Sequence, residues 1–149
     1  MTNTPGPGPI RVLIADDQRV VRDGLAMLVG LIDGVKVVGT ACDGAEAVRL
    51  AEARRPDVVL MDLRMPGTDG VAATADLRQR LPATPVLVLT TYADEDAIVP
   101  ALRAGARGYL TKDASAEQIE AAIHAVHAGQ SPTWADPPAT RPPASPRDG

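Results

Sequence analysis

The sequence predicts a doubly wound α/β domain, with one five-stranded parallel sheet and five helices. Three observations predict it: short, β-branched apolar runs recur along the chain, stretches with helical spacing separate them, and polar residues follow several of the runs. The runs are continuous rather than alternating, so each strand should be buried on both faces, as in a parallel sheet covered by helices. Strands that alternate with helices in this way indicate five βα units.

The apolar runs give the predicted strands, which cover residues 10–15, 35–40, 57–61, 86–90 and 108–111. The third run is the most informative, because Val58-Val59-Leu60-Met61 leads directly into Asp62. In a doubly wound sheet the functional site lies at the carboxyl ends of the strands. The residues that follow each run are therefore the first candidates for a site.

The intervening stretches should form helices that cover the sheet. The residues expected on their buried faces are Val21, Leu25 and Leu28; Ala47, Val48 and Ala51; Val71, Ala75 and Arg78; Ile98, Ala101 and Leu102; and Ile119, Ala122, Ile123 and Val126. Ser115 and Gln118 have the spacing of a capping box, and Gly129 suits the position after the last helix. Pro100 lacks a backbone donor and should kink or shorten the fourth helix.

Composition bounds the domain organisation and the function. Residues 1–9 should be a flexible leader, 10–129 one domain with an aliphatic core, and 130–149 a Pro-rich linker or disordered tail.

Charge and cysteine content limit the classes of function. A net charge of −4 gives no excess of positive charge with which to bind nucleic acid. One cysteine, Cys42, excludes an intrachain disulfide, fits the reducing cytoplasm and should be a small core residue. No apolar run is long enough to span a membrane, and the N-terminus lacks the pattern of a signal peptide.

Polar residues end or directly follow four of the predicted strands. These are the pair Asp16-Asp17, then Asp62, Thr90 and Lys112. Each has a simpler interpretation: one of the pair could cap the first helix, Asp62 could open a turn, Thr90 could be an ordinary strand residue, and Lys112 could be solvated. The edge carries no site only if all of these simpler interpretations hold together.

The chemistry of this set favours phosphoryl transfer. Three neighbouring carboxylates repel one another, and a hard divalent cation such as Mg²⁺, with Mn²⁺ as an alternative, relieves that repulsion. A cation, an ammonium and a hydroxyl would neutralise phosphoryl oxygens while Asp62 attacks in line, giving an aspartyl phosphate. Of the 15 basic residues only Lys36 and Lys112 are lysines. The use of lysine at position 112 suggests that the site requires a compact ammonium rather than a planar guanidinium.

These residues resemble the receiver domain of bacterial two-component response regulators, which has a flavodoxin-like fold. The matching pieces are Asp16-Asp17, Asp62, Met65-Pro66-Gly67-x-Asp69-Gly70, Thr90, and Gly105-Ala106-x-Gly108-Tyr109-Leu110-x-Lys112. They occur in family order and cover about residues 10–129. The resemblance implies a phosphorylation-activated signalling switch that catalyses only its own metal-dependent phosphorylation and dephosphorylation and is not otherwise an enzyme.

The resemblance also implies a role for each metal-site residue. Asp62 would accept the phosphoryl group from a sensor histidine kinase. Asp17, Asp62 and the backbone carbonyl of Arg64 would be the direct Mg²⁺ ligands, and Asp16 would act through water.

The remaining roles concern the switch and the lifetime of the phosphoryl group. Lys112 would pair with the phosphoryl group, Thr90 would hydrogen-bond one of its oxygens, and Tyr109 would turn inward behind Thr90. Arg64 and Tyr92 lie two residues after Asp62 and Thr90, and we expect them to screen the attacking water and slow autodephosphorylation.

Lys112-Asp113-Ala114 replaces the Lys-Pro of many receivers and is familiar from the NarL/FixJ-type subfamily. Its members usually add a LuxR-type DNA-binding domain and regulate transcription. This chain looks like a receiver excised from such a regulator, or one that lost its output domain, so it would act at DNA only through a domain outside this chain. A homodimer formed on phosphorylation, through the first and fifth helices, is implied by resemblance alone.

Two other functions stay open at this point. An atypical receiver would retain the fold and act as an unphosphorylated binding module. A phosphatase of the haloacid-dehalogenase type would also form an aspartyl phosphate, but it needs a carboxylate two residues after the nucleophile, where this chain has Arg64.

Overall fold

The computed structural model describes residues 8–65, 67–91 and 96–129. Strands and helices alternate through these residues, which confirms the predicted α/β class. In chain order the elements are β1 (Ile10–Ala15), α1 (Arg19–Gly30), β2 (Val35–Ala41), α2 (Gly44–Arg54), β3 (Val58–Asp62), α3 (Gly70–Arg80), β4 (Val86–Thr90), α4 (Ile98–Ala104), β5 (Gly108–Thr111) and α5 (Ala116–His127). The strands that the sequence predicts differ from these by one residue at most at either end.

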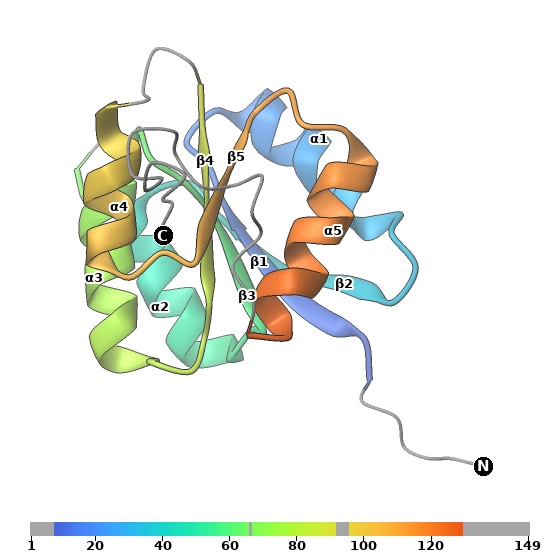
Figure 1. Cartoon of the computed structure of the whole chain (residues 1–149), viewed down its shortest axis with the longest axis horizontal. Coiled ribbons are helices and arrows are strands. Elements are labelled where there is room, and N and C mark those ends of the chain that lie inside the picture. The colour runs from blue at the N-terminus through green and yellow to red at the C-terminus, as the bar shows by residue number, and fades with distance from the viewer. Residues whose placement is uncertain (1–7, 66, 92–95, 130–149) are drawn as a thin grey trace, which may run out of the picture.

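The five strands form one parallel sheet in the order β2-β1-β3-β4-β5. Helices α1 and α5 lie on one side of this sheet, and α2, α3 and α4 lie on the other (Figure 1). The strand order reverses beside β1, so β1 and β3 flank the topological switch point. In open sheets of this kind the site lies outside the carboxyl ends of the strands at that point.

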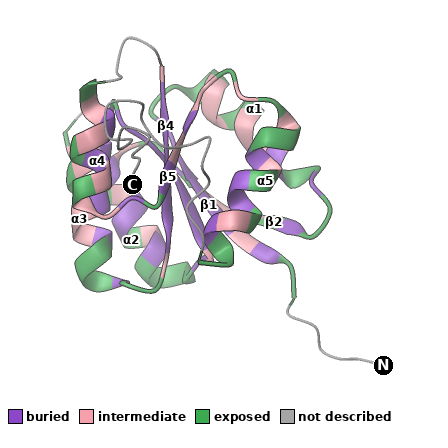
Figure 2. Ribbon diagram, viewed as in Figure 1, coloured by how far each residue is buried: buried purple, intermediate pink, exposed green. Residues whose placement is uncertain are grey.

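The core has two aliphatic halves, one on each face of the sheet, and the central strands β1, β3 and β4 between them are almost wholly buried (Figure 2). Side chains along β1 alternate between the halves because successive strand residues point to opposite faces. Leu13 and Ala15 pack with α2, α3 and α4, whereas Val12 and Ile14 pack with α1 and α5. Burial on both faces explains why the strands read as continuous apolar runs.

Two expectations about buried positions are wrong. The buried face of α3 holds Ala73, Thr74 and Leu77, and the face marked by Val71, Ala75 and Arg78 is half-buried or exposed. Small residues let α3 approach the sheet, so the spacing of its larger apolar residues does not indicate which face is buried. Cys42 is exposed rather than in the core, because it lies just beyond the end of β2, where the chain turns into α2.

The expected helix signals are confirmed. Pro100 is the third residue of α4, a helix of only seven residues, and its missing donor falls in the first turn, where backbone N–H groups lack helical acceptors. Ser115 and Gln118 form both bonds of a capping box at the start of α5. Gly129 has a φ of +85° and donates its N–H to the carbonyl of Val126. Among the described residues, no helix combines the length and hydropathy needed to span a membrane.

Candidate functional site

The polar residues that the sequence places at strand ends lie along one edge of the sheet. Asp16 follows β1, Asp62 ends β3, Thr90 ends β4, and Lys112 follows β5. Those four strands are consecutive neighbours in the sheet. Because the strands are parallel, their carboxyl ends meet at the same edge, and the fold alone brings these residues together.

Three carboxylates form an acidic cluster at this edge. Asp16, Asp17 and Asp62 each offer an oxygen within 4.8 Å of the others. Asp16 is fully buried and Asp62 is 2% exposed, whereas Asp17 is exposed. Oδ2 of Asp16 is buried without a hydrogen-bond partner among the described residues. A buried carboxylate oxygen in that state is costly, and the set of oxygen donors fits a hard divalent cation.

Lys112 lies against both buried carboxylates. Its Nζ is 3.1 Å from Oδ2 of Asp62 and 3.3 Å from Oδ2 of Asp16, and its side chain is 21% exposed. The contact with Asp16 has the distance of an ion pair but not the geometry of a hydrogen bond. The backbone N–H of Lys112 donates to the carbonyl of Thr90 at 2.8 Å, and that of Arg64 donates to Oδ1 of Asp62 at 3.3 Å. One ammonium therefore forms ion pairs with two buried carboxylates.

The pKa shifts in the cluster arise because two buried carboxylates share a single ammonium. Burial, followed by the charge of Asp16, raises the pKa of Asp62 to about 6, against the opposing effects of Lys112 and of the Arg64 N–H. Burial alone would lower the pKa of Lys112, but the bond to Asp62 and the charges of Asp62 and Asp16 raise it overall. Lys112 thus stays protonated, and the folded protein holds a proton on Asp62 more tightly than an unfolded chain does.

We expect Asp62→Asn to stabilise the protein in EDTA at alkaline pH. The raised pKa means that the wild type loses stability as pH rises from about 4 to about 6, and an amide escapes that loss of up to about 3 kcal/mol. Urea unfolding should show Asp62→Asn more stable by about 1–3 kcal/mol at pH 8 and of equal stability near pH 4. Asp33→Asn, at an exposed site, is the control. A difference that does not change with pH would contradict the assignment.

The other candidates that the structure describes lie on β4, on β5 and in the loop after β3. Thr90 is buried, and its hydroxyl donates to the carbonyl of Thr91 at 3.1 Å. Tyr109 is half-buried on β5 and packs against the core half that holds α2, α3 and α4. Arg64 is exposed. Tyr92 lies outside the described residues.

Two of the simpler interpretations are wrong: the acidic pair does not cap the first helix, and Lys112 is not merely solvated. The residue that precedes α1 as its N-cap is Gln18, and no side chain caps that helix end. Asp16 instead accepts the N–H of Gln18 at 2.9 Å, so neither Asp16 nor Asp17 is a helix cap. The two ion pairs of Lys112 exclude a lysine that is merely solvated.

Sequence reasoning missed several residues that shape the site. Arg22 on α1 donates from Nη1 to the backbone carbonyl of Asp16 at 3.1 Å, which fixes the acidic turn. Gly44 donates its N–H to the carbonyl of Thr68 at 3.0 Å, which ties α2 to the loop after β3. Gly70 belongs to the motif that the sequence offers, and the structure supplies the reason, because an added Cβ would lie 2.1 Å from the carbonyl oxygen of Asp62. The contact of Gly44 with Thr68 leaves no local signal, because it joins segments that meet only in the fold, and the bond of Arg22 depends on the turn between β1 and α1.

The fold and the site together define a class of protein. The five-stranded parallel sheet, with acids after β1 and β3 and a lysine after β5, is the arrangement that the resemblance implied. The sequence model of the response regulator receiver domain family matches residues 12–124. The chain therefore belongs to the response regulator receiver domain family.

Individual relatives agree with this assignment. The chain is 47% identical over 120 residues to the transcriptional regulatory protein LnrK of Bacillus subtilis, covering 80% of this chain and 54% of LnrK. It is 42% identical over 132 residues to the oxygen regulatory protein NreC of Staphylococcus carnosus, covering 88% of this chain and 60% of NreC. It thus spans little more than half the length of these relatives.

A solved structure gives the same result for the fold. The signal receiver domain of the putative response regulator NarL from Mycobacterium tuberculosis superposes with a TM-score of 0.78 at 37% identity, covering 83% of this chain and all of that one. The flavodoxin-like receiver fold is therefore confirmed, together with the NarL- and LuxR-like character of the relatives.

Proposed function

We propose that the protein is a signalling switch that accepts a phosphoryl group on Asp62 from a sensor histidine kinase. The observation that carries the proposal is the placement of Lys112, whose Nζ lies 3.1 Å from Asp62 and 3.3 Å from Asp16. A buried carboxylate beside a fixed ammonium and two further acids suits phosphoryl transfer, in which positioning and charge neutralisation supply most of the catalysis. Receiver domains are signalling switches rather than classical enzymes.

The acidic cluster fits a divalent cation, and we propose Mg²⁺, with Mn²⁺ as an alternative. Asp17, Asp62 and the backbone carbonyl of Arg64 would hold it, and Asp16 would act through water. When bound, the cation supplies positive charge that offsets the carboxylates and the phosphoryl oxygens. The buried Oδ2 of Asp16, which lacks a hydrogen-bond partner among the described residues, and the short distances among the three acids support this donor set.

The chain's own residues then have the following roles. A carboxylate oxygen of Asp62 forms a bond to phosphorus while the bond from phosphorus to the donor histidine nitrogen breaks, and that nitrogen leaves with the electron pair. Lys112 stabilises the added negative charge. The hydroxyl of Thr90 moves from the carbonyl of Thr91 to a phosphoryl oxygen, and Tyr109 follows it inward, which favours the active state of a pre-existing equilibrium.

Intact-protein mass spectrometry tests this function. The protein is incubated with Mg²⁺ and acetyl phosphate or phosphoramidate, alongside Asp62→Asn. The proposal expects the mass to rise by one phosphoryl group in the wild type and not in the variant. No gain with either donor would favour the unphosphorylated binding module. Turnover of an unrelated phosphoester would favour a phosphatase, although Arg64 occupies the position that such an enzyme needs for its acid.

Arg64 is proposed to set the lifetime of the phosphoryl group, because its exposed side chain is attached beside Asp62. We expect Arg64→Ala to shorten the half-life of the aspartyl phosphate by about tenfold, a barrier change of about 1.4 kcal/mol. The loss of the added mass with time, after removal of the donor, measures this. An unchanged half-life, or a wild type as short-lived as fast chemotaxis-type receivers, would contradict the role. Tyr92 has the matching proposed role, but it lies outside the described residues.

A homodimer formed on phosphorylation through α1 and α5 is also proposed. Val20 and Met27 on α1 and Leu31 just after it are 71–85% exposed, which leaves apolar area that a partner copy could cover. We expect Met27→Glu to raise the dissociation constant of the phosphorylated dimer by about tenfold or more. Gln79→Glu, at an exposed position of α3, should leave it unchanged. Sedimentation equilibrium measures both. A phosphorylated wild type that stays monomeric would contradict the proposal.

The relatives' names supply the proposed context. Transcriptional regulators act at DNA, and we propose that any such action involves a part of the protein outside residues 10–129. The cytoplasmic location and the domain bounds 1–9, 10–129 and 130–149 stay predictions.

A further inference from the structure

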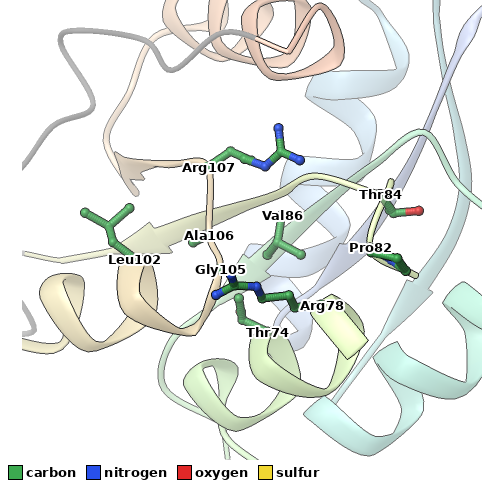
Figure 3. A pocket seen from close by; sticks show the side chains of 9 residues that line it. All are labelled: Thr74, Arg78, Pro82, Thr84, Val86, Leu102, Gly105, Ala106 and Arg107. Atoms are coloured by element: carbon green, nitrogen blue, oxygen red, sulfur yellow. The ribbon is translucent and has the colours of Figure 1, made fainter. Parts of the chain in front are cut away.

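We propose that a second site binds a small organic phosphate, about the size of a nucleotide. It is a hollow between α3, α4 and the segments that lead into β4 and β5 (Figure 3). Its volume is about 470 Å³, within the range of small-molecule pockets. The hollow lies at the amino ends of β4 and β5, on the opposite edge of the sheet from the acidic cluster, so a ligand there leaves Asp62 free.

The charge of this hollow selects an anion. Arg78 and Arg107 line it, and none of the described residues that line it is acidic. Neither arginine forms an ion pair within the described part of the chain, whereas Arg80, two residues after Arg78 on α3, pairs with both Asp76 and Glu52. The whole chain carries a net charge of −4. The hollow therefore concentrates positive charge locally, in a protein whose net charge is negative.

Arg78 is exposed, but the packing of its stem restrains it before any ligand arrives. Its stem packs on Gly105, where an added Cβ would lie 2.6 Å from Cδ of Arg78. Its Nη1 donates to the carbonyl of Arg103 at 3.4 Å, a long bond that leaves its other N–H groups for a ligand. Figure 3 shows Arg78 reaching from α3 and Arg107 from the segment before β5, with Val86 between them in that view. A guanidinium that is already positioned loses less conformational freedom when it binds.

The remaining walls indicate what is attached to the anionic group. Leu102 is half-buried and offers apolar surface, the buried Val86 and Ala106 add a little more, and Thr84 adds a hydroxyl. A guanidinium binds phosphate oxygens in a bidentate manner, and the apolar wall would cover the organic part of the molecule. The structure therefore assigns this hollow to an organic phosphate rather than to an inorganic ion.

The test is a titration of the full ¹⁵N-labelled chain with ADP, and separately with pyrophosphate, followed by NMR. EDTA is present throughout, so that no cation can draw phosphate to the acidic cluster. Arg78→Gln and Arg107→Gln each remove one guanidinium from the hollow. Arg103→Gln is the matched control, because it removes the same charge from neighbouring α4 and does not line the hollow. The spectrum of each variant reports whether it is folded, and Arg107→Gln keeps the test valid if Arg78→Gln unfolds.

The proposal expects saturable shifts with ADP at Thr84, Gly105 and Arg107, weakened by about tenfold in each pocket variant and by less than about twofold in the control. Pyrophosphate should bind more weakly than ADP. No saturable shift below ~10 mM ADP, or an equal loss in Arg103→Gln, would overturn the site. Binding of pyrophosphate as tight as that of ADP would overturn the assignment to an organic phosphate.

Discussion

Replacing Lys112 with methionine should lower the rate of phosphorylation by acetyl phosphate by about 100-fold or more. The reason is geometric: Nζ lies within 3.3 Å of two carboxylates whose side chains are 0% and 2% exposed. In the proposed reaction the same ammonium stabilises the negative charge that the phosphoryl oxygens gain. Methionine keeps the apolar stem and removes only the charge, so packing is largely preserved.

The same variant should be less stable by about 2–4 kcal/mol at pH 8 in EDTA, because two buried carboxylates lose their shared cation. Protonation of Asp62, whose pKa is already about 6, should reduce this loss at acidic pH. Lys36→Met is the control, since Lys36 is the other lysine of the chain and is exposed on β2. Stopped-flow phosphorylation and urea unfolding measure the two effects. A Lys112→Met protein that is phosphorylated as fast as Lys36→Met would refute the role of Lys112.

Replacing Gly70 with alanine should destabilise the protein more than the same change at any other glycine that the structure describes. The new Cβ would lie 2.1 Å from the carbonyl oxygen of Asp62 and 2.7 Å from Cα of Leu63. Both are backbone atoms, so the end of β3 and the start of α3 must move apart. The bond from the Gly70 N–H to the Leu63 carbonyl, at 3.2 Å, would be lost as well. We expect a loss of about 3 kcal/mol or more.

Gly24 provides the matched control. It lies within α1, and an added Cβ there has no atom within 4 Å. Alanine is a better helix former than glycine, so Gly24→Ala should raise stability by up to about 1 kcal/mol. Urea unfolding of the two variants compares the same chemical change at a crowded and an open position. Equal effects of the two substitutions would show that the close approach at Gly70 is not as tight as described.

Much of the fold could be predicted from the sequence because strand burial leaves a plain pattern. A strand covered on both faces must be apolar throughout, and Val58-Val59-Leu60-Met61 is an example. The polar residues of the edge could also be placed, since parallel strands bring their ends together without further information. That reasoning located Asp62 and Lys112 on one edge, and the structure adds the 3.1 Å contact between them.

What the sequence could not predict depends on contacts between distant segments. The buried face of α3 uses Ala73 and Thr74, residues whose apolar signal is too weak to fix a helix face. The close approach of Gly70 to Asp62 is a matter of backbone geometry, which residue type alone does not reveal. Arg78 and Arg107 are 29 positions apart in the numbering and share a hollow only because α3 and the segment before β5 are neighbours.

Reductive trapping of the phosphorylated protein tests the central claim most directly. Borohydride converts an aspartyl phosphate into homoserine, and peptide sequencing by mass spectrometry then locates the modified residue. We predict homoserine at position 62, formed only when Mg²⁺ and a phosphodonor are both present. Homoserine at position 16 or 17 in place of 62, or none in a protein whose mass shows a phosphoryl group, would contradict the assignment of Asp62 as the nucleophile.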